Sequence, residues 1–87
     1  MATRMEKIEE VCEFVLGLDQ ALNYVEKYIK TSLINDIKQN KLSMYHASVY
    51  LMHVLREVQV REDPNDFNIQ HRIDELMNSM SEIASRS

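Results

Sequence analysis

Hydrophobic residues recur with a seven-residue period through the first half of the chain. Counted as a heptad from Ile8, the a positions are Ile8, Val15, Leu22 and Ile29, and the d positions are Val11, Leu18, Val25 and Ser32. All of them except Ser32 are apolar, and such a phase held over several heptads is typical of a long helix packed on other helices. The pattern therefore predicts a continuous helix from about residue 4 to residue 38. Apolar residues on the flanking e and g positions widen its face, which favours a bundle over a two-stranded coiled coil.

Gly17 allows a second interpretation of the same segment. On the continuous helix, Gly17 falls on the outer face, where glycine costs about 1 kcal/mol relative to alanine without obstructing packing. In the alternative, Gly17 ends a first helix and Asp19 is the N-cap of a new one, so that the chain kinks into a four-helix arrangement. We favour the continuous helix, because an independent second helix would have no reason to inherit the register of the first.

The polar segment at residues 39–43 predicts a tight antiparallel turn. Asn40 is suited to a left-handed position after a helix, and Ser43 is suited to the N-cap of the next one. From Met44 to about Arg61, apolar residues occur on most sides of the predicted second helix. A helix of that kind is normally covered on most sides, so we expect it to lie centrally.

A third helix is predicted to begin at the only proline of the chain. Asp63 is the expected N-cap and Pro64 the expected first helical residue, a combination that favours helix initiation. The apolar stripe of this helix consists of Ile69, Ile73, Leu76, Met80 and Ile83. The fold class expected from sequence is thus an all-α antiparallel three-helix bundle with a long first helix.

The helix lengths predict an intermolecular contact. At about 1.5 Å per residue, the first helix would be about 52 Å long and the other two about 27 to 33 Å. The second helix packs back from residue 38, so it would leave the N-terminal apolar face uncovered. Exposing that face would forfeit on the order of 6–12 kcal/mol. We therefore expect a homodimer to cover it, with docking of a different protein as the alternative. The expected interface comprises Ile8, Val11, Phe14, Val15 and Leu18, with Tyr45, Val49 and Met52 as the next-best apolar surface.

Composition fits a single helical domain spanning residues 1–87. One glycine and one proline are too few for the frequent turns of an all-β protein. The formal net charge of −4 opposes the electrostatic term that supplies most non-specific nucleic-acid affinity. A single cysteine cannot form an internal disulfide, and no uninterrupted apolar run approaches the ~20 residues that span a bilayer. We expect a cytoplasmic protein with no membrane partner.

No constellation of side chains predicts catalysis or a bound cofactor. His46 and His53 are about 10 Å apart on one helix, too far to share a metal ion. His71 and Glu75 have the spacing of a surface charge pair, and Cys12 that of a small buried hydrophobe. We therefore predict no catalytic residue, no metal ligand and no cofactor, and expect that the protein is not an enzyme.

The remaining function classes rest on surfaces. We expect a non-catalytic helical protein–protein interaction module: a small regulator, adaptor, inhibitor or chaperone-like subunit. One alternative is a dimeric nucleic-acid-binding transcriptional regulator, and a further alternative is a metal-binding helical protein. The nucleic-acid alternative would use the only basic cluster, which consists of Lys27, Lys30, Lys38 and Lys41. A lysine cluster near a helix C-terminus is more simply a solvated face favoured by the helix dipole.

Overall fold

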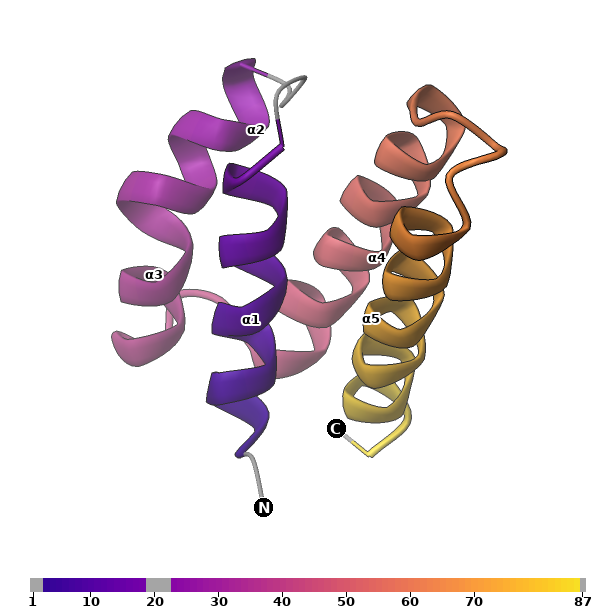
Figure 1. Cartoon of the computed structure of the whole chain (residues 1–87). Coiled ribbons are helices and arrows are strands. Elements are labelled where there is room, and N and C mark those ends of the chain that lie inside the picture. Colours follow the sequence, from indigo (N-terminus) through magenta and orange to yellow (C-terminus); the bar gives the residue numbers. More distant parts are fainter. Residues whose placement is uncertain (1–2, 19–22, 87) are drawn as a thin grey trace.

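The computed structural model describes residues 3–18 and 23–86, and the regular structure of these residues is entirely helical. The elements are α1 (Arg4–Leu16), α2 (Asn23–Tyr28), the π-helical stretch η1 (Ile29–Leu33), α3 (Ile34–Lys38), α4 (Met44–Arg61) and α5 (Phe67–Ser85). Figure 1 shows α1 beside the run formed by α2, η1 and α3, with α4 and α5 forming a second pair. The all-α prediction is confirmed over the described residues.

The prediction of one continuous helix over residues 4–38 is wrong. A capping box between Thr3 and Glu6 begins α1, and the helix ends at Leu16 with Gly17 as its C-cap. The Gly17 N–H donates to the Glu13 carbonyl oxygen at 3.0 Å, and its φ of −82° is right-handed. Gly17 thus ends the helix without the left-handed conformation of a glycine C′ residue. The Asp19 N-cap of the kinked alternative lies outside the described residues.

The run from α2 to α3 buries a stripe with a four-residue period. Its buried apolar residues are Val25, Ile29, Leu33 and Ile37. The seven-residue phase required Ser32 after Ile29, but Ser32 is only half-buried, whereas Leu33 is fully buried. Only Val25 and Ile29 fit both patterns in this run. The seven-residue pattern and the observed four-residue stripe therefore coincide only as far as Ile29. Their agreement up to that residue does not indicate one continuous helix.

The turn between α3 and α4 matches its prediction. Asn40 has a φ of 60°, and the Lys41 and Leu42 amides both donate to the Asp36 carbonyl oxygen, at 2.8 and 3.1 Å. The Ser43 hydroxyl accepts from the His46 backbone N–H at 3.1 Å, and α4 spans the predicted residues 44–61. Local turn chemistry fixes this reversal, and it sets the direction of α4.

The start of α5 differs from its prediction. Asp66 is the N-cap, and its carboxylate accepts from the Ile69 N–H at 3.2 Å. The Asp63 carboxylate instead accepts from the Asn65 N–H at 2.9 Å, two residues further on. That local bond makes an Asx turn, which holds residues 63–65 outside the helix, so Pro64 lies in the turn and not in the first helical position.

The core draws on every described helix. The apolar stripe of α5 is buried from Ile73 to Ile83, and α4 contributes its largest fully buried side chains at Leu51 and Leu55. Helix α1 contacts α4, α5 and η1, and Ile8, Val11 and Val15 on it are 0%, 0% and 1% exposed. The expectation that these three side chains lack an intrachain partner is therefore wrong. The chain reverses between α1 and α2, so α1 lies against the other helices instead of extending beyond them.

Candidate interaction surface

The eight residues of the predicted interface separate into two groups. Ile8, Val11 and Val15 lie in the core, and Phe14 and Leu18 are half-buried residues packed against it. Tyr45 is 46% exposed, and Val49 and Met52 are half-buried on the same side of α4. Of the predicted interface, only the three α4 residues Tyr45, Val49 and Met52 thus lie together on an accessible surface.

Large exposed hydrophobic residues are confined to one part of the described chain. They are Tyr45 and Val60 on α4 and Phe67 at the first position of α5, with Val60 and Phe67 at 81% and 77% exposure. Neither Val60 nor Phe67 was singled out from the sequence. The spacing of Val60 could have indicated its exposure. It does not belong to the buried stripe of α4, and it continues the line of residues from Tyr45 and Val49 at helical spacing.

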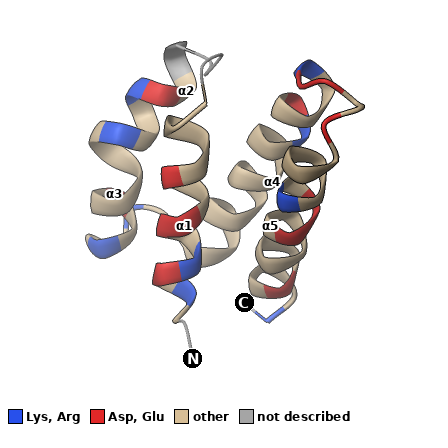
Figure 2. Cartoon of the chain, viewed as in Figure 1, with Lys and Arg blue, Asp and Glu red and all other residues tan. Residues whose placement is uncertain are grey.

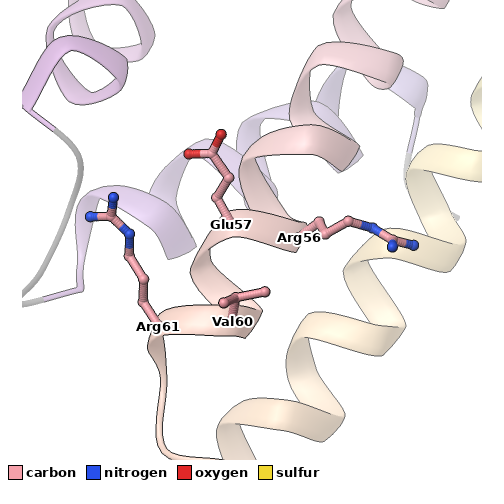
Figure 3. A pocket seen from close by; sticks show the side chains of 4 residues that line it. All are labelled: Arg56, Glu57, Val60 and Arg61. Carbon is pink, nitrogen blue, oxygen red and sulfur yellow. The ribbon is translucent and has the colours of Figure 1, made fainter.

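Two hollows follow this line on α4. The first, of about 390 Å³, is lined by Val49, Met52, His53 and Arg56 from α4 and by Met77 from α5. The second, of about 380 Å³, is lined by Arg56, Glu57, Val60 and Arg61 (Figure 3). Arg56 lines both, and we refer to the lining residues of the two hollows together as the α4–α5 groove; only the first hollow includes a residue of α5.

The charge of the α4–α5 groove is positive. Figure 3 shows Arg56 extending toward α5 and Arg61 extending to the other side of α4. Neither guanidinium has an ion pair within the described residues, although Arg72 pairs with Glu10 and Glu75, and Arg86 pairs with Glu82. The groove therefore combines apolar side chains with cations that are free to meet an anionic group.

Each of the other two outer faces carries charges of both signs, with one sign in excess. Glu6, Glu9, Glu10 and Glu13 lie on α1, and Figure 2 shows these acidic residues beside the lysine-bearing run from α2 to α3. Lys27, Lys30, Lys38 and Lys41 are all exposed, and none has an ion pair among the described residues. These faces are polar, and the apolar exposure belongs to α4 and α5.

The cysteine and two of the histidines, Cys12, His46 and His71, have contacts that are explained by packing, helix capping or a surface ion pair. Cys12 is 6% exposed, and burial, followed by the nearby Glu9 carboxylate, raises the pKa of its thiol to about 11. It is a protonated thiol in the core, which confirms its interpretation as a small buried hydrophobe. The His46 Nδ1 atom lies 2.8 Å from the Ser43 Oγ atom, which also caps α4, and His71 forms an exposed pair with Glu75 at 2.9 Å.

The described residues contain neither a candidate metal site nor a candidate membrane-spanning helix. No group of three or more His, Cys, Asp or Glu side chains is placed there to hold a metal ion. None of the helices described combines the length and the apolar character that crossing a bilayer requires. The metal-binding alternative stays a prediction from sequence.

Comparison of the chain with protein-family models, with curated proteins and with solved structures finds no match.

Proposed function

We propose that this protein is a non-catalytic helical protein–protein interaction module, a small regulator or adaptor that binds its partner through the α4–α5 groove. One observation carries the proposal: the large exposed hydrophobics Tyr45, Val60 and Phe67 all lie on α4 or at the start of α5. Scattered single apolar residues are normal on a surface, but Val60 lines one of two adjoining hollows whose other apolar lining residues are Val49, Met52 and Met77, and an accessible apolar patch with a polar rim supports a docking face.

The composition of the groove supports this assignment. Tyrosine, methionine and arginine are enriched in protein interfaces, whereas lysine and glutamate are depleted at their centres. Met52, Arg56 and Met77 line the α4–α5 groove, whose only glutamate is Glu57, whereas the faces of α1 and of the α2–α3 run carry several glutamates and lysines. Flexible thioethers at Met52 and Met77 can also adapt to the shape of a partner.

Affinity capture with matched variants tests the assignment. Val60→Glu and Asn35→Glu each add one carboxylate at an exposed helix position, the first on the groove and the second on α3. We expect wild type and Asn35→Glu to retain the same partner protein and Val60→Glu to lose it. Loss with Asn35→Glu alone would move the binding face to the α2–α3 run and contradict the proposal.

A second copy of the chain is one candidate partner. The face first assigned to a homodimer now lies in the core, so self-association would use Tyr45, Val49 and Met52 instead. Sedimentation of wild type and Val60→Glu at micromolar concentration tests it. A dimer that dissociates on Val60→Glu assigns the groove to self-association, and a monomeric parent protein assigns it to a different partner.

The exposed lysines favour one further candidate function, nucleic-acid binding. Lys27, Lys30, Lys38 and Lys41 are exposed and unpaired within the described residues, so their charges are free to contact phosphates. Binding of duplex DNA or RNA would then weaken steeply with salt and disappear when the four lysines are changed to glutamate. Binding that is independent of salt and of these lysines would exclude this candidate.

A further inference from the structure

We infer that Met52 and Met77 form a paired site of reversible methionine oxidation, which makes the first hollow of the α4–α5 groove polar. The inference goes beyond the proposed function and depends on the first hollow alone, so its tests need no partner protein. The oxidant is a peroxide, an oxygen-atom donor small enough to enter the hollow.

The first hollow is lined by methionines of two neighbouring helices. Met52 lies on α4 and Met77 on α5, and both line the hollow of about 390 Å³. Both are half-buried, whereas Met80, three residues further along α5, is 0% exposed. A water molecule occupies about 30 Å³ in the liquid, and hydrogen peroxide is only slightly larger, so it can enter the hollow. Met52 and Met77 are therefore open to an oxidant that does not reach Met80 in the folded chain.

The only thiol of the chain is protected from the same oxidant. Cys12 is 6% exposed, and burial raises the pKa of its thiol to about 11. Peroxides react with the thiolate form of cysteine, and at neutral pH Cys12 is protonated. A thioether has no proton to lose and reacts as it is. Accessible methionines are therefore the sulfur groups of the folded chain that a peroxide oxidises first.

The reaction is a transfer of one oxygen atom to each sulfur. An S–O bond forms, the O–O bond of hydrogen peroxide breaks, and the remaining atoms of the peroxide leave as water, so that the sulfur loses two electrons and the peroxide gains them. A thiol-dependent methionine sulfoxide reductase reverses the step, because two thiols become a disulfide as the oxygen leaves as water. The product side chain is polar, whereas Met52 and Met77 are apolar side chains packed against the core.

The same hollow supplies hydrogen-bond donors for the oxidised form. His53 and Arg56 line it with the two methionines, and Arg56 extends toward α5 (Figure 3). A thioether sulfur is a weak acceptor, whereas the oxygen of a sulfoxide is a polar acceptor. The Arg56 guanidinium has no ion pair among the described residues. Its N–H groups can therefore donate to the oxygen atoms that oxidation adds.

Peptide mapping by mass spectrometry tests the site. The folded protein is treated with hydrogen peroxide, and each methionine-containing peptide is followed for the gain of one oxygen atom. We expect Met52 and Met77 to be oxidised at least about tenfold faster than Met80, whose oxidation requires local unfolding. We expect a methionine sulfoxide reductase with a thiol reductant to remove both oxygen atoms. Protection of Met52 and Met77 equal to that of Met80 would overturn the inference.

Thermal unfolding with matched variants tests the effect of the pair. We expect peroxide to lower the melting temperature of wild type by about 4–8 °C, because sulfoxides replace apolar groups packed against the core. Met52→Leu plus Met77→Leu conserves volume and should remove this shift. Met5→Leu plus Met44→Leu is the control, since these methionines are also half-buried and packed against the core, and it should keep the shift. A shift that persists without Met52 and Met77 would overturn the inference.

Two arginine variants test the donor. Arg56→Ala removes a guanidinium from the first hollow, and Arg61→Ala removes one that lines only the second. We expect oxidation to lower the melting temperature further in Arg56→Ala than in wild type, because the sulfoxide oxygens lose a donor, and to lower it equally in Arg61→Ala and wild type. Equal shifts in the two variants would overturn the role of Arg56.

Discussion

Helices α1 and α4 both carry apolar residues at helical spacing, but the chain covers only one of the two sets completely. On α1, Ile8, Val11 and Val15 are almost fully buried. On α4, a buried stripe is accompanied by a second line on which Tyr45 and Val60 stay exposed. The same kind of pattern thus produces core on one helix and accessible surface on the other. An apolar line shows which face avoids water, and the path of the chain decides what covers it.

The difference between the two helices arises from the reversal after Gly17. Because α1 ends there, its apolar face lies against α4, α5 and η1. Helix α4 packs mainly against α5 and α1 and meets α2 at the Tyr28–Tyr50 ring contact, and these neighbours leave Tyr45 and Val60 exposed. Substitutions on α1, on α4 and at the two chain reversals test this explanation, and those in the buried face of α1 should have the largest effect on stability.

Val11→Glu combined with Val15→Glu should abolish the native fold. Each buried unpaired carboxylate costs several kcal/mol, and two of them are comparable to the 5–15 kcal/mol that stabilises a typical domain. Thermal unfolding followed by circular dichroism should show no cooperative transition for this variant. Val60→Glu on the exposed line of α4 should unfold cooperatively like wild type. A double variant that stays folded would show that α1 is not part of the core.

Asn40→Ala should lower the free energy of unfolding by about 1 kcal/mol, because alanine keeps the Cβ that crowds the carbonyl oxygen at a φ of 60° and lacks the short amide side chain that lets asparagine adopt this conformation. Asn40→Gly removes the Cβ and should be close to wild type. Urea unfolding measures both. Equal losses for the two variants would mean that the Asn40 side chain, and not its backbone conformation, holds α4 in place.

Raising the pH should weaken the core of α1 through Cys12. Burial raises the pKa of the Cys12 thiol in the folded chain to about 11, whereas the thiol of the unfolded chain has its ordinary pKa of 9.0. The contribution of this group is therefore unchanged at neutral pH and is lost as pH rises from about 9 toward 11, by on the order of 1 kcal/mol near pH 10. Urea unfolding of wild type and Cys12→Ala over this pH range isolates the effect, and a constant difference between the two would refute it.

Gly17→Ala should have the smallest effect, within about 1 kcal/mol. A Cβ at this position would lie 3.3 Å from the Glu13 carbonyl oxygen, and the right-handed backbone tolerates alanine. The better helix propensity of alanine offsets that tight contact. Urea unfolding gives the stability, and X-ray scattering should give the same radius of gyration as wild type. A longer particle would mean that glycine itself, and not burial of the α1 face, maintains the reversal.

The predictable parts of the fold depend on local chemistry. Asn40 and Ser43 were assigned correctly because a left-handed cap and a hydroxyl N-cap involve only neighbouring residues. The assignment of Asp63 as the N-cap failed because Asp66 can also cap a helix, and a bond from the Asn65 amide engages the Asp63 carboxylate instead. The path after Gly17 depends on contacts between distant helices, which a periodic pattern does not specify.

The candidate surface was predictable to a similar degree. Tyr45, Val49 and Met52 were identified as apolar surface on the second helix, and the structure leaves them at least partly accessible. Val60 and Phe67 were missed because a single apolar residue near a helix end carries little periodic signal. The contribution of Met77 depends on the side-by-side packing of α4 and α5, which sequence spacing alone does not give.

The π-helical stretch η1 affects the direction in which the side chains of the α2–α3 run point around the helix axis. Residues four apart on an α-helix differ by about 400°, so a four-residue period drifts around the axis by about 40° per step. From Val25 to Ile37 the drift would amount to about 120°, enough to turn one end of the stripe away from the core. All four stripe residues are nevertheless at most 7% exposed. The wider turn at Ile29–Leu33 takes up part of the surplus rotation, so a sequence with the wrong period for an α-helix still keeps all four apolar residues buried, and η1 itself contacts α1.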